Sequence, residues 1–284
     1  MIQRQNPIIP EGINTTDEHP LKDFFLMLLG IGLAIVATLL LLASLAEYLV
    51  RFIPFHAEQS LVNKLNPFSQ QQTTEKKQQT ESYLQALANE LAAAQQLPSN
   101  MSITVHYIDK PIVNAMATLG GHIMIYQGLL DLMPNENALA MVVAHEIAHI
   151  KHRDPIVALG RGVTMGVALM SIMGFSDSSV SQQIIGTAGE LTALSFSRKQ
   201  EREADLTALH AIKQHYGHVA AANSIFKHFK SQEGSLDRLA LFSTHPLSED
   251  RIKAIDRFTK QYPSPATTLT SPLPNFLNGK EQIQ

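Results

Sequence analysis

The sequence contains no cysteine, and this absence excludes several classes of protein together. Disulfide-stapled folds, thiolate metal sites, cysteine nucleophiles and lipid anchors on cysteine all need that side chain. Charge is scarce and nearly balanced, because 22 Lys and Arg stand against 25 Asp and Glu. Nucleic-acid binding needs a basic excess, so we expect no nucleic-acid partner. The 284 residues suffice for one sizeable domain with attachments.

Charged residues are missing altogether from 24–46, a run rich in Leu, Ile, Val and Ala. About 20 apolar residues cross a bilayer as a helix, so the run predicts one transmembrane helix. A cleaved signal peptide is the alternative, since Ser44 and Ala46 are small enough to flank a processing site. The run is longer than a usual signal-peptide core, and no compact basic leader precedes it, so the anchor is favoured. Basic residues on the two sides balance and leave the orientation open.

The remaining chain changes character several times. The stretch 54–80 is polar and rich in Gln, which is typical of a tether. Apolar spacing predicts a helix over 81–97, and alternation predicts strands at 103–107 and 123–125. Beyond Met133 the pattern is helical almost throughout. These changes predict an N-terminal tail (1–23), the transmembrane helix (24–46), a polar linker (47–80), a main domain (81–262) and a disordered tail (263–284).

An apolar run at 163–175 interrupts the helical part of the main domain. It is too short to cross a membrane comfortably, and Arg161 comes just before it. We interpret it as a buried or membrane-facing helix. Its methionines could line an adaptable groove, although an ordinary core is the better interpretation.

One short motif carries metal chemistry: His145-Glu146-Ile147-Ala148-His149. Asn135 is a good N-cap for the helix that holds it. Residues four apart lie one above the other on a helix, so the two imidazoles can converge on one metal ion beside Glu146. Zinc with one further protein ligand keeps a position for water, whose proton Glu146 could accept. Chance placement is the alternative, but the surrounding residues are apolar, and buried polar groups need partners.

A third ligand must come from another helix. His152 lies roughly 10 Å along the axis from His145, too far for bonds of about 2 Å. The segment 196–205 offers Glu201 and Asp205 one turn apart, so one carboxylate could bind the metal while the other accepts the spare N–H of a ligand histidine. Glu203 is about 200° from Glu201 around the helix and faces away.

These motifs resemble those of the membrane-associated zinc endopeptidases of the HtpX and CAAX prenyl protease family. The resemblance covers about residues 80–258. In chain order it rests on Asn114-Ala115, Gly120-Gly121 before a strand, His145 to His149, Ser197-Arg198 with Glu201 and Asp205, and Thr244-His245-Pro246 before Arg251-Ile252.

The resemblance implies one Zn²⁺ per chain and an α+β, mostly helical fold. That fold is a zincin-like catalytic domain with a small sheet. The one N-terminal transmembrane helix is predicted from the apolar run, and here the chain departs from some members of the family, which have more membrane spans. The resemblance also implies that the strand near Asn114 receives substrate. The implied site residues are His145, His149 and Glu201 as metal ligands, Glu146 as general base, Asp205 as the acceptor behind a ligand histidine, and His245 as a further active-site histidine that stabilises an oxyanion or gates the metal.

The expected function is a membrane-anchored, zinc-dependent endopeptidase acting in quality control of membrane or envelope proteins. Its expected partners are polypeptide substrates and the membrane. We expect a single-pass integral membrane protein with its catalytic domain outside the cytoplasm, in the periplasm. The rival is a non-catalytic or latent membrane-tethered chaperone on a protease fold, which the intact Glu146 disfavours. His106 and His122 flank the predicted strands, and the sequence indicates no role for them.

Overall fold

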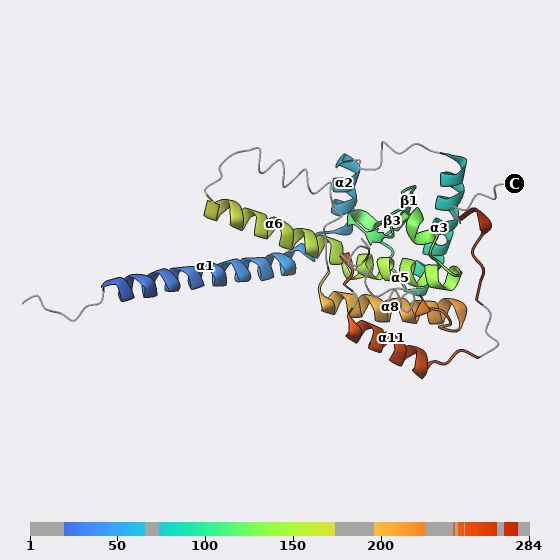
Figure 1. Cartoon of the computed structure of the whole chain (residues 1–284). Helices are drawn as coiled ribbons and strands as arrows, with labels where there is room; N and C mark the ends of the chain where they lie inside the picture. Colours follow the sequence, from blue (N-terminus) through green and yellow to red (C-terminus); the bar gives the residue numbers. More distant parts are fainter. Residues whose placement is uncertain are drawn as a thin grey trace, which may run out of the picture. The chain divides into compact units, whose positions relative to one another are not determined.

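The computed structural model describes residues 20–65, 74–173, 196–224, 241, 244–246, 248–265 and 270–277. Two units are separately compact, 1–42 and 43–284. The described elements are α1 (Pro20–Val50), α2 (Phe55–Leu65), α3 (Glu75–Ala94), β1 (Thr104–Ile108), β2 (Ala115–Ala117), η1 (Leu119–Gly121), β3 (His122–Tyr126), α4 (Gln127–Leu130), α5 (Glu136–His152), α6 (Asp154–Met173), α8 (Arg198–Tyr216), α11 (Glu249–Gln261) and η4 (Asn275–Leu277). The expected fold class, mostly helical with a small sheet, is confirmed (Figure 1).

Helix α1 contains the predicted apolar run and extends beyond it at both ends. Within it, Leu21–Val50 is long and apolar enough to cross a membrane, and it is the one such helix among the described residues. Its apolar side chains are largely exposed. The expected tail at 1–23 lies outside the described residues up to residue 19.

The sheet has three strands in the order β1-β3-β2. β1 runs parallel to β3, and β2 runs antiparallel to it, with Ala115 opposite Ile125 and Ala117 opposite Ile123. Alternation turns one face of the sheet toward the helices, where Val105 is buried with both isoleucines. The two strands predicted from alternation are confirmed, and β2 lies at an edge of the sheet.

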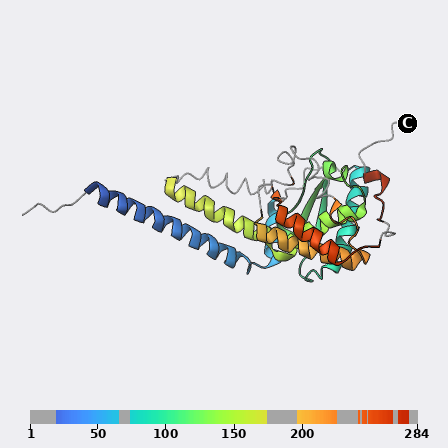
Figure 2. The same ribbon diagram turned by 60° about the horizontal axis from the view of Figure 1, so that its bottom comes forward.

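Helix α5 packs between α3 and α8, and α11 packs on α8, as two views of the ribbon show (Figures 1 and 2). Fourteen residues of α5, from Asn137 to Ile150, are buried, which explains why the sequence of this helix is apolar on more than one side. Such a helix can hold polar side chains only where they have partners, so the polar residues of α5 mark the site.

Two stretches differ from expectation. Part of the predicted tether is helix α2, which is anchored by the buried Phe55, Glu58 and Val62. Within the expected disordered tail, the described stretch 270–277 is tied to the domain because the Leu277 side chain is fully buried and its carbonyl accepts a hydrogen bond from the Gln127 side chain. In both places a few buried residues outweigh a polar composition. The Gln-rich centre of the tether, 66–73, and the chain end, 278–284, lie outside the described residues.

The apolar run at 163–175 belongs to helix α6 as far as Met173. Val163 is exposed. Our interpretation of the run as a buried or membrane-facing helix stays a prediction.

Candidate metal centre

Helix α5 presents the two histidines of the motif on one face. Asn135 caps the helix by accepting a hydrogen bond from the Ala138 amide, as the sequence predicted. The Nε2 atoms of His145 and His149 are 3.0 Å apart, and both rings are buried. The spacing of four residues therefore brings the two nitrogens to one point.

Helix α8 brings carboxylates to the same point. It starts with a capping box in which Ser197 and Gln200 satisfy each other's backbone amides, and this fixes its first turn. The Glu201 carboxylate oxygens lie 3.4 Å from His145 Nε2 and 3.5 Å from His149 Nε2. Glu203 is on the exposed side, near Lys199. The helical phase thus places Glu201, and not Glu203, at the histidines.

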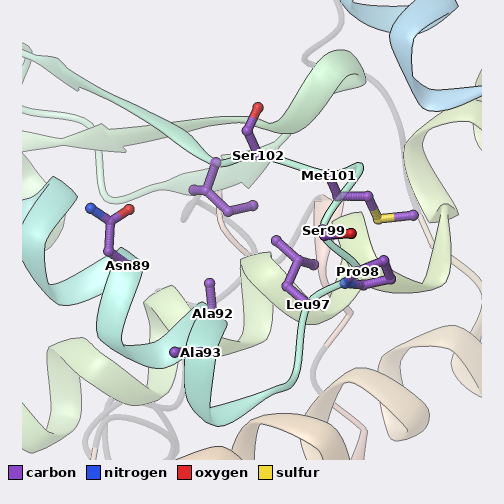
Figure 3. A pocket seen from close by; sticks show the side chains of 9 residues that line it. Asn89, Ala92, Ala93, Leu97, Pro98, Ser99, Met101 and Ser102 are labelled. Atoms are coloured by element: carbon purple, nitrogen blue, oxygen red, sulfur yellow. The ribbon is translucent and has the colours of Figure 1, made fainter.

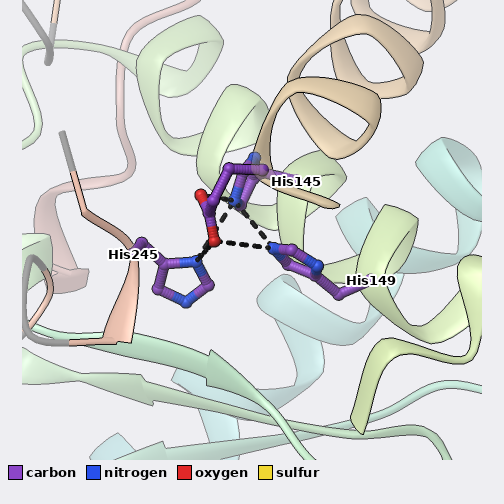
Figure 4. Close-up of side chains that lie close together, drawn as sticks. His145, His149 and His245 are labelled. Carbon is purple, nitrogen blue, oxygen red and sulfur yellow. Dashed lines mark hydrogen bonds and ion pairs between the residues drawn. The ribbon is translucent and has the colours of Figure 1, made fainter. Parts of the chain in front are cut away.

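His245 completes the cluster, although it is far away in sequence. Its Nδ1 lies 3.1 Å from Glu201 Oε1 and 3.3 Å from His145 Nε2. Each of His145, His149, Glu201 and His245 offers one ligand atom, and these four atoms all lie within 4.8 Å of one another. Figure 4 shows the three histidine rings converging. Four buried donors at one point are the arrangement of a metal site.

Two further residues hold the cluster from behind, and the role of one of them, Arg251, could not be read from the sequence. Asp205 Oδ1 lies 3.1 Å from His145 Nδ1. Arg251, near the start of α11, donates two hydrogen bonds of 2.8 Å to Asp205 and lies 2.6 Å from Glu201 Oε2. Arg251 stood in a recognised motif, but nothing in the motif indicated that its guanidinium would join both carboxylates.

Asp154 has the corresponding place behind the second histidine. Its Oδ2 lies 2.8 Å from His149 Nδ1, and its Oδ1 accepts a hydrogen bond of 2.7 Å from Gln200 Nε2. Asp154 starts α6 and Gln200 belongs to the first turn of α8, so this buried carboxylate links the helices around the metal ligands. The role of Asp154 was not predicted from the sequence. Its one signal was an acidic residue directly after the motif helix.

The buried charges fit a cation. Burial lowers the pKa of His145, but hydrogen bonds to Asp205 and Glu201 outweigh it and raise the pKa to about 10. For Glu201, burial has the opposite effect and raises the pKa. Its hydrogen bonds with the three histidines outweigh burial and hold that pKa well below the usual range. Carboxylates gathered here thus attract positive charge strongly, and a divalent cation would supply it.

Glu146 is held by the edge strand. Its Oε2 accepts a hydrogen bond of 2.7 Å from the Ala117 amide of β2. Its Oε1 is buried, has no hydrogen-bond partner in the described part of the chain, and lies 3.5 Å from His245 Nε2. A buried carboxylate oxygen without a hydrogen bond is costly, and it points to a ligand or water that completes the site.

A separate cavity of about 280 Å³ lies between α3 and the segment that follows it (Figure 3). Its lining is apolar or uncharged and includes Asn89, Leu97 and Met101. Because no titratable side chain lines it, this cavity offers neither metal ligands nor a general base.

A histidine pair and a carboxylate on facing helices, with a base beside them, define a metallopeptidase type of centre. Residues 78–259 match the model of peptidase family M48, and the chain belongs to this family. The match confirms the resemblance stated above.

Individual relatives match about half of the chain each. The mitochondrial metalloendopeptidase OMA1 of Schizosaccharomyces pombe is 31% identical over 163 residues, 56% of this chain and 48% of the relative. Metalloprotease LoiP of Escherichia coli is 34% identical over 149 residues, 50% and 57% of the two chains. The protease HtpX homolog of Dictyoglomus thermophilum is 28% identical over 188 residues, 53% and 62% of the two chains. The chain spans about half the length of the curated relatives that it matches.

Proposed function

We propose that the protein is a membrane-anchored, zinc-dependent endopeptidase. The observation that carries the proposal is the convergence of His145, His149 and Glu201 at one buried point with Glu146 beside them. Two imidazoles and one carboxylate form a donor set that zinc accepts in hydrolytic enzymes. The names of the relatives, which include metalloendopeptidase and metalloprotease, agree with this function.

The proposed ligands are His145 Nε2, His149 Nε2 and the Glu201 carboxylate. Bound zinc supplies a water of lowered pKa and polarises a carbonyl oxygen. Asp205 and Asp154 hold the outer nitrogens of the two histidines, which fixes the tautomer that leaves each Nε2 with a lone pair. Arg251 keeps Asp205 and Glu201 ionised and in place.

Glu146 acts as the proton carrier in this proposal. The Ala117 amide holds its Oε2, which leaves Oε1 to accept a proton from the attacking water. The same oxygen then gives the proton to the leaving amine nitrogen when the peptide bond breaks, so that one carboxyl performs both transfers.

An extended peptide would bind along β2. In the antiparallel pair the backbone groups of Ala115 and Ala117 point away from β3, and Ala117 already donates to Glu146. A peptide added to this edge would lie directly beside the base, and main-chain hydrogen bonds would bind it with little sequence preference. The Leu241 amide donates a hydrogen bond to the Val113 carbonyl just before the strand, so Leu241 lies beside this edge.

His245 fits a gating role better than an oxyanion role. Its Nδ1 lies among the proposed ligand atoms, where a water must sit for hydrolysis. A ring in that place keeps the enzyme latent until it moves. His245 is thus an active-site residue in the gating role, one of the two roles that the resemblance implied.

The proposed substrates are misfolded or misassembled membrane and envelope proteins, and the proposed location of the catalytic domain is outside the cytoplasm. Relatives with names such as beta-barrel assembly-enhancing protease support these assignments. A reporter fused after Gln284 tests the location. Activity confined to a reporter that works only in the cytoplasm would reverse it.

The test uses the full chain in detergent. Its zinc content and its cleavage of casein are measured. Glu146→Gln should keep zinc and lower turnover about a hundredfold to ten-thousandfold, because it removes the base without removing a ligand. Glu203→Gln, on the exposed side of α8, is the matched control and should cleave normally. Equal turnover of Glu146→Gln and the unmodified chain, or full cleavage after zinc removal, would show that Glu146 and zinc do not catalyse the cleavage. Absence of cleavage by the unmodified, zinc-loaded chain would favour the rival chaperone function.

A further inference from the structure

The exposed large apolar side chains outside α1 are concentrated in one place. Seven such side chains occur among the described residues after Val50, and five of them are Phe52, Ile53, Leu61, Leu65 and Val163. We call these five the corner patch. Ile53, Leu61 and Val163 line the same cavity, Phe52 precedes Ile53, and Leu65 is one helical turn from Leu61. Monomeric soluble domains rarely expose apolar side chains in one contiguous group.

The cavity inside the corner patch is almost purely apolar. It measures about 350 Å³ and is formed by the end of α1, by α2 and by the start of α6. Val50 packs closely on Gly160, because a Cβ added to Gly160 would lie 2.8 Å from the Cγ1 of Val50. This close contact joins α1 to α6 at two of the cavity walls. The one ionisable residue in the lining is Glu58, whose carboxylate is already bound by the Gly120 amide and Arg153.

Two observations favour a lipid as the occupant. Ala46 and Val50 line the cavity and belong to the last turns of α1, the helix that is apolar enough to cross a membrane. Arg51 and Lys64, at the exposed ends of α1 and α2, are the side chains that meet anionic headgroups at a membrane surface.

We propose that the corner patch lies in the membrane interface and that its cavity takes a hydrocarbon chain of a membrane phospholipid. The proposal rests on the proposed role of α1 as a membrane anchor. It adds a second contact with the membrane, made by the folded domain itself. Helix α2 then has two faces, one packed on the domain through Phe55 and Val62 and one turned to lipid through Leu61 and Leu65.

The chain contains no tryptophan, so a single introduced tryptophan reports its own surroundings. Leu61→Trp and Val163→Trp place reporters on two sides of the cavity. Leu206→Trp is the matched control, because Leu206 is 43% exposed, close to the 40% of Leu61, and is absent from the cavity lining. Leu33→Trp reports on α1. Each full-length variant is placed in nanodiscs of phosphatidylcholine and phosphatidylglycerol, with or without bromine near the headgroup end of the acyl chains.

Brominated lipid should reduce the fluorescence of Leu61→Trp and Val163→Trp to about half or less, since an interfacial helix face is buried roughly 5–10 Å into the headgroup and acyl boundary. Leu33 is near the middle of the span, so Leu33→Trp is measured with bromine near the methyl end of the acyl chains, where it should be quenched. Leu206→Trp should be unchanged. Quenching of Leu33→Trp without quenching of either corner reporter would overturn the proposal and leave the anchor intact. Absence of quenching in Leu33→Trp would instead show that the anchor assignment is wrong. Two corner reporters keep the test valid if one variant misfolds.

Discussion

The Arg251 guanidinium donates two hydrogen bonds of 2.8 Å to the Asp205 carboxylate, and both groups are buried. The same guanidinium reaches Glu201, a proposed metal ligand. One cation from α11 therefore fixes two carboxylates of α8. The metal site is thus assembled from the start of the last long helix as well as from the two helices that carry its ligands.

Arg251→Ala should destabilise the domain by about 3–5 kcal/mol, because it leaves two buried carboxylates without their partner. Arg251→Lys should recover only part of this loss, since an ammonium cannot form the two parallel bonds. Thermal unfolding of the full chain in detergent measures the effect. Arg257→Ala, six residues further along the same helix and exposed, should change stability by no more than about 0.5 kcal/mol. Equal melting of both alanine variants would contradict the assignment.

Asp154→Ala should weaken zinc binding about 10- to 100-fold, because His149 loses the acceptor that fixes its tautomer and orientation. Competition with a chelator measures the affinity. Gln200→Ala removes the neighbouring donor to Asp154 and half of the capping box of α8, but it leaves the contact between Asp154 and His149 in place and should have a smaller effect. Unchanged affinity in Asp154→Ala would mean that His149 is held sufficiently by packing alone.

Glu201→Ala should remove zinc and activity together, whereas Glu203→Ala should affect neither. The two glutamates are two residues apart on one helix, and both substitutions remove the same charge. A difference between the two variants therefore reports the position of the carboxylate at the site. Metal analysis of the purified variants decides the matter. Zinc retained in Glu201→Ala and lost in Glu203→Ala would mean that the proposed ligand is wrong.

His245→Ala should still bind zinc and should cleave casein faster, because the ring no longer occupies the position of the water. Turnover and zinc content are measured on the same preparation. A lower turnover at full zinc content would favour the other role, stabilisation of an oxyanion, over gating.

His106 should make stability depend on pH. Burial, the charge of His122 and that of Lys77 lower its pKa to about 4. The folded chain therefore binds fewer protons than the unfolded chain between about pH 4 and 6.5, so this contribution is complete above about 6.5 and is lost as the pH falls through 4. His106→Gln should reduce the fall in stability by roughly 1–2 kcal/mol in urea unfolding with chelator present, after allowance for partial exposure. His56→Gln, at an exposed position, is the control, and an equal reduction there would contradict the prediction.

The sequence predicted those parts of the site that a short motif can encode. His145, Glu146 and His149 lie on one helix, and helical phase separated Glu201 from Glu203 without any tertiary information. Asp154 and Arg251 could not be found this way, because their roles exist only where separate helices meet. Their side chains are ordinary charged residues in the sequence and become partners of the metal ligands through packing alone.

Most predicted elements of the fold were also found, because apolar periodicity reports which face of a segment is buried. Helix α2 was missed for the opposite reason. Its composition is polar, and only three buried residues fix it to the domain. Composition averages over such a segment, whereas the packing depends on single positions such as Phe55, which contacts the Gly121 region closely.

Four residues, 51–54, join α1 to α2, so the last residue of α1 and the first of α2 are at most about 18 Å apart. A free tether over 54–80 would have allowed roughly 90 Å of reach. With α1 in a membrane, this short connection therefore keeps the catalytic domain close to the bilayer surface. The distance that the domain can reach from the bilayer, more than any sequence preference, would decide which polypeptides it binds. These would be polypeptides whose unfolded segments emerge at the membrane surface.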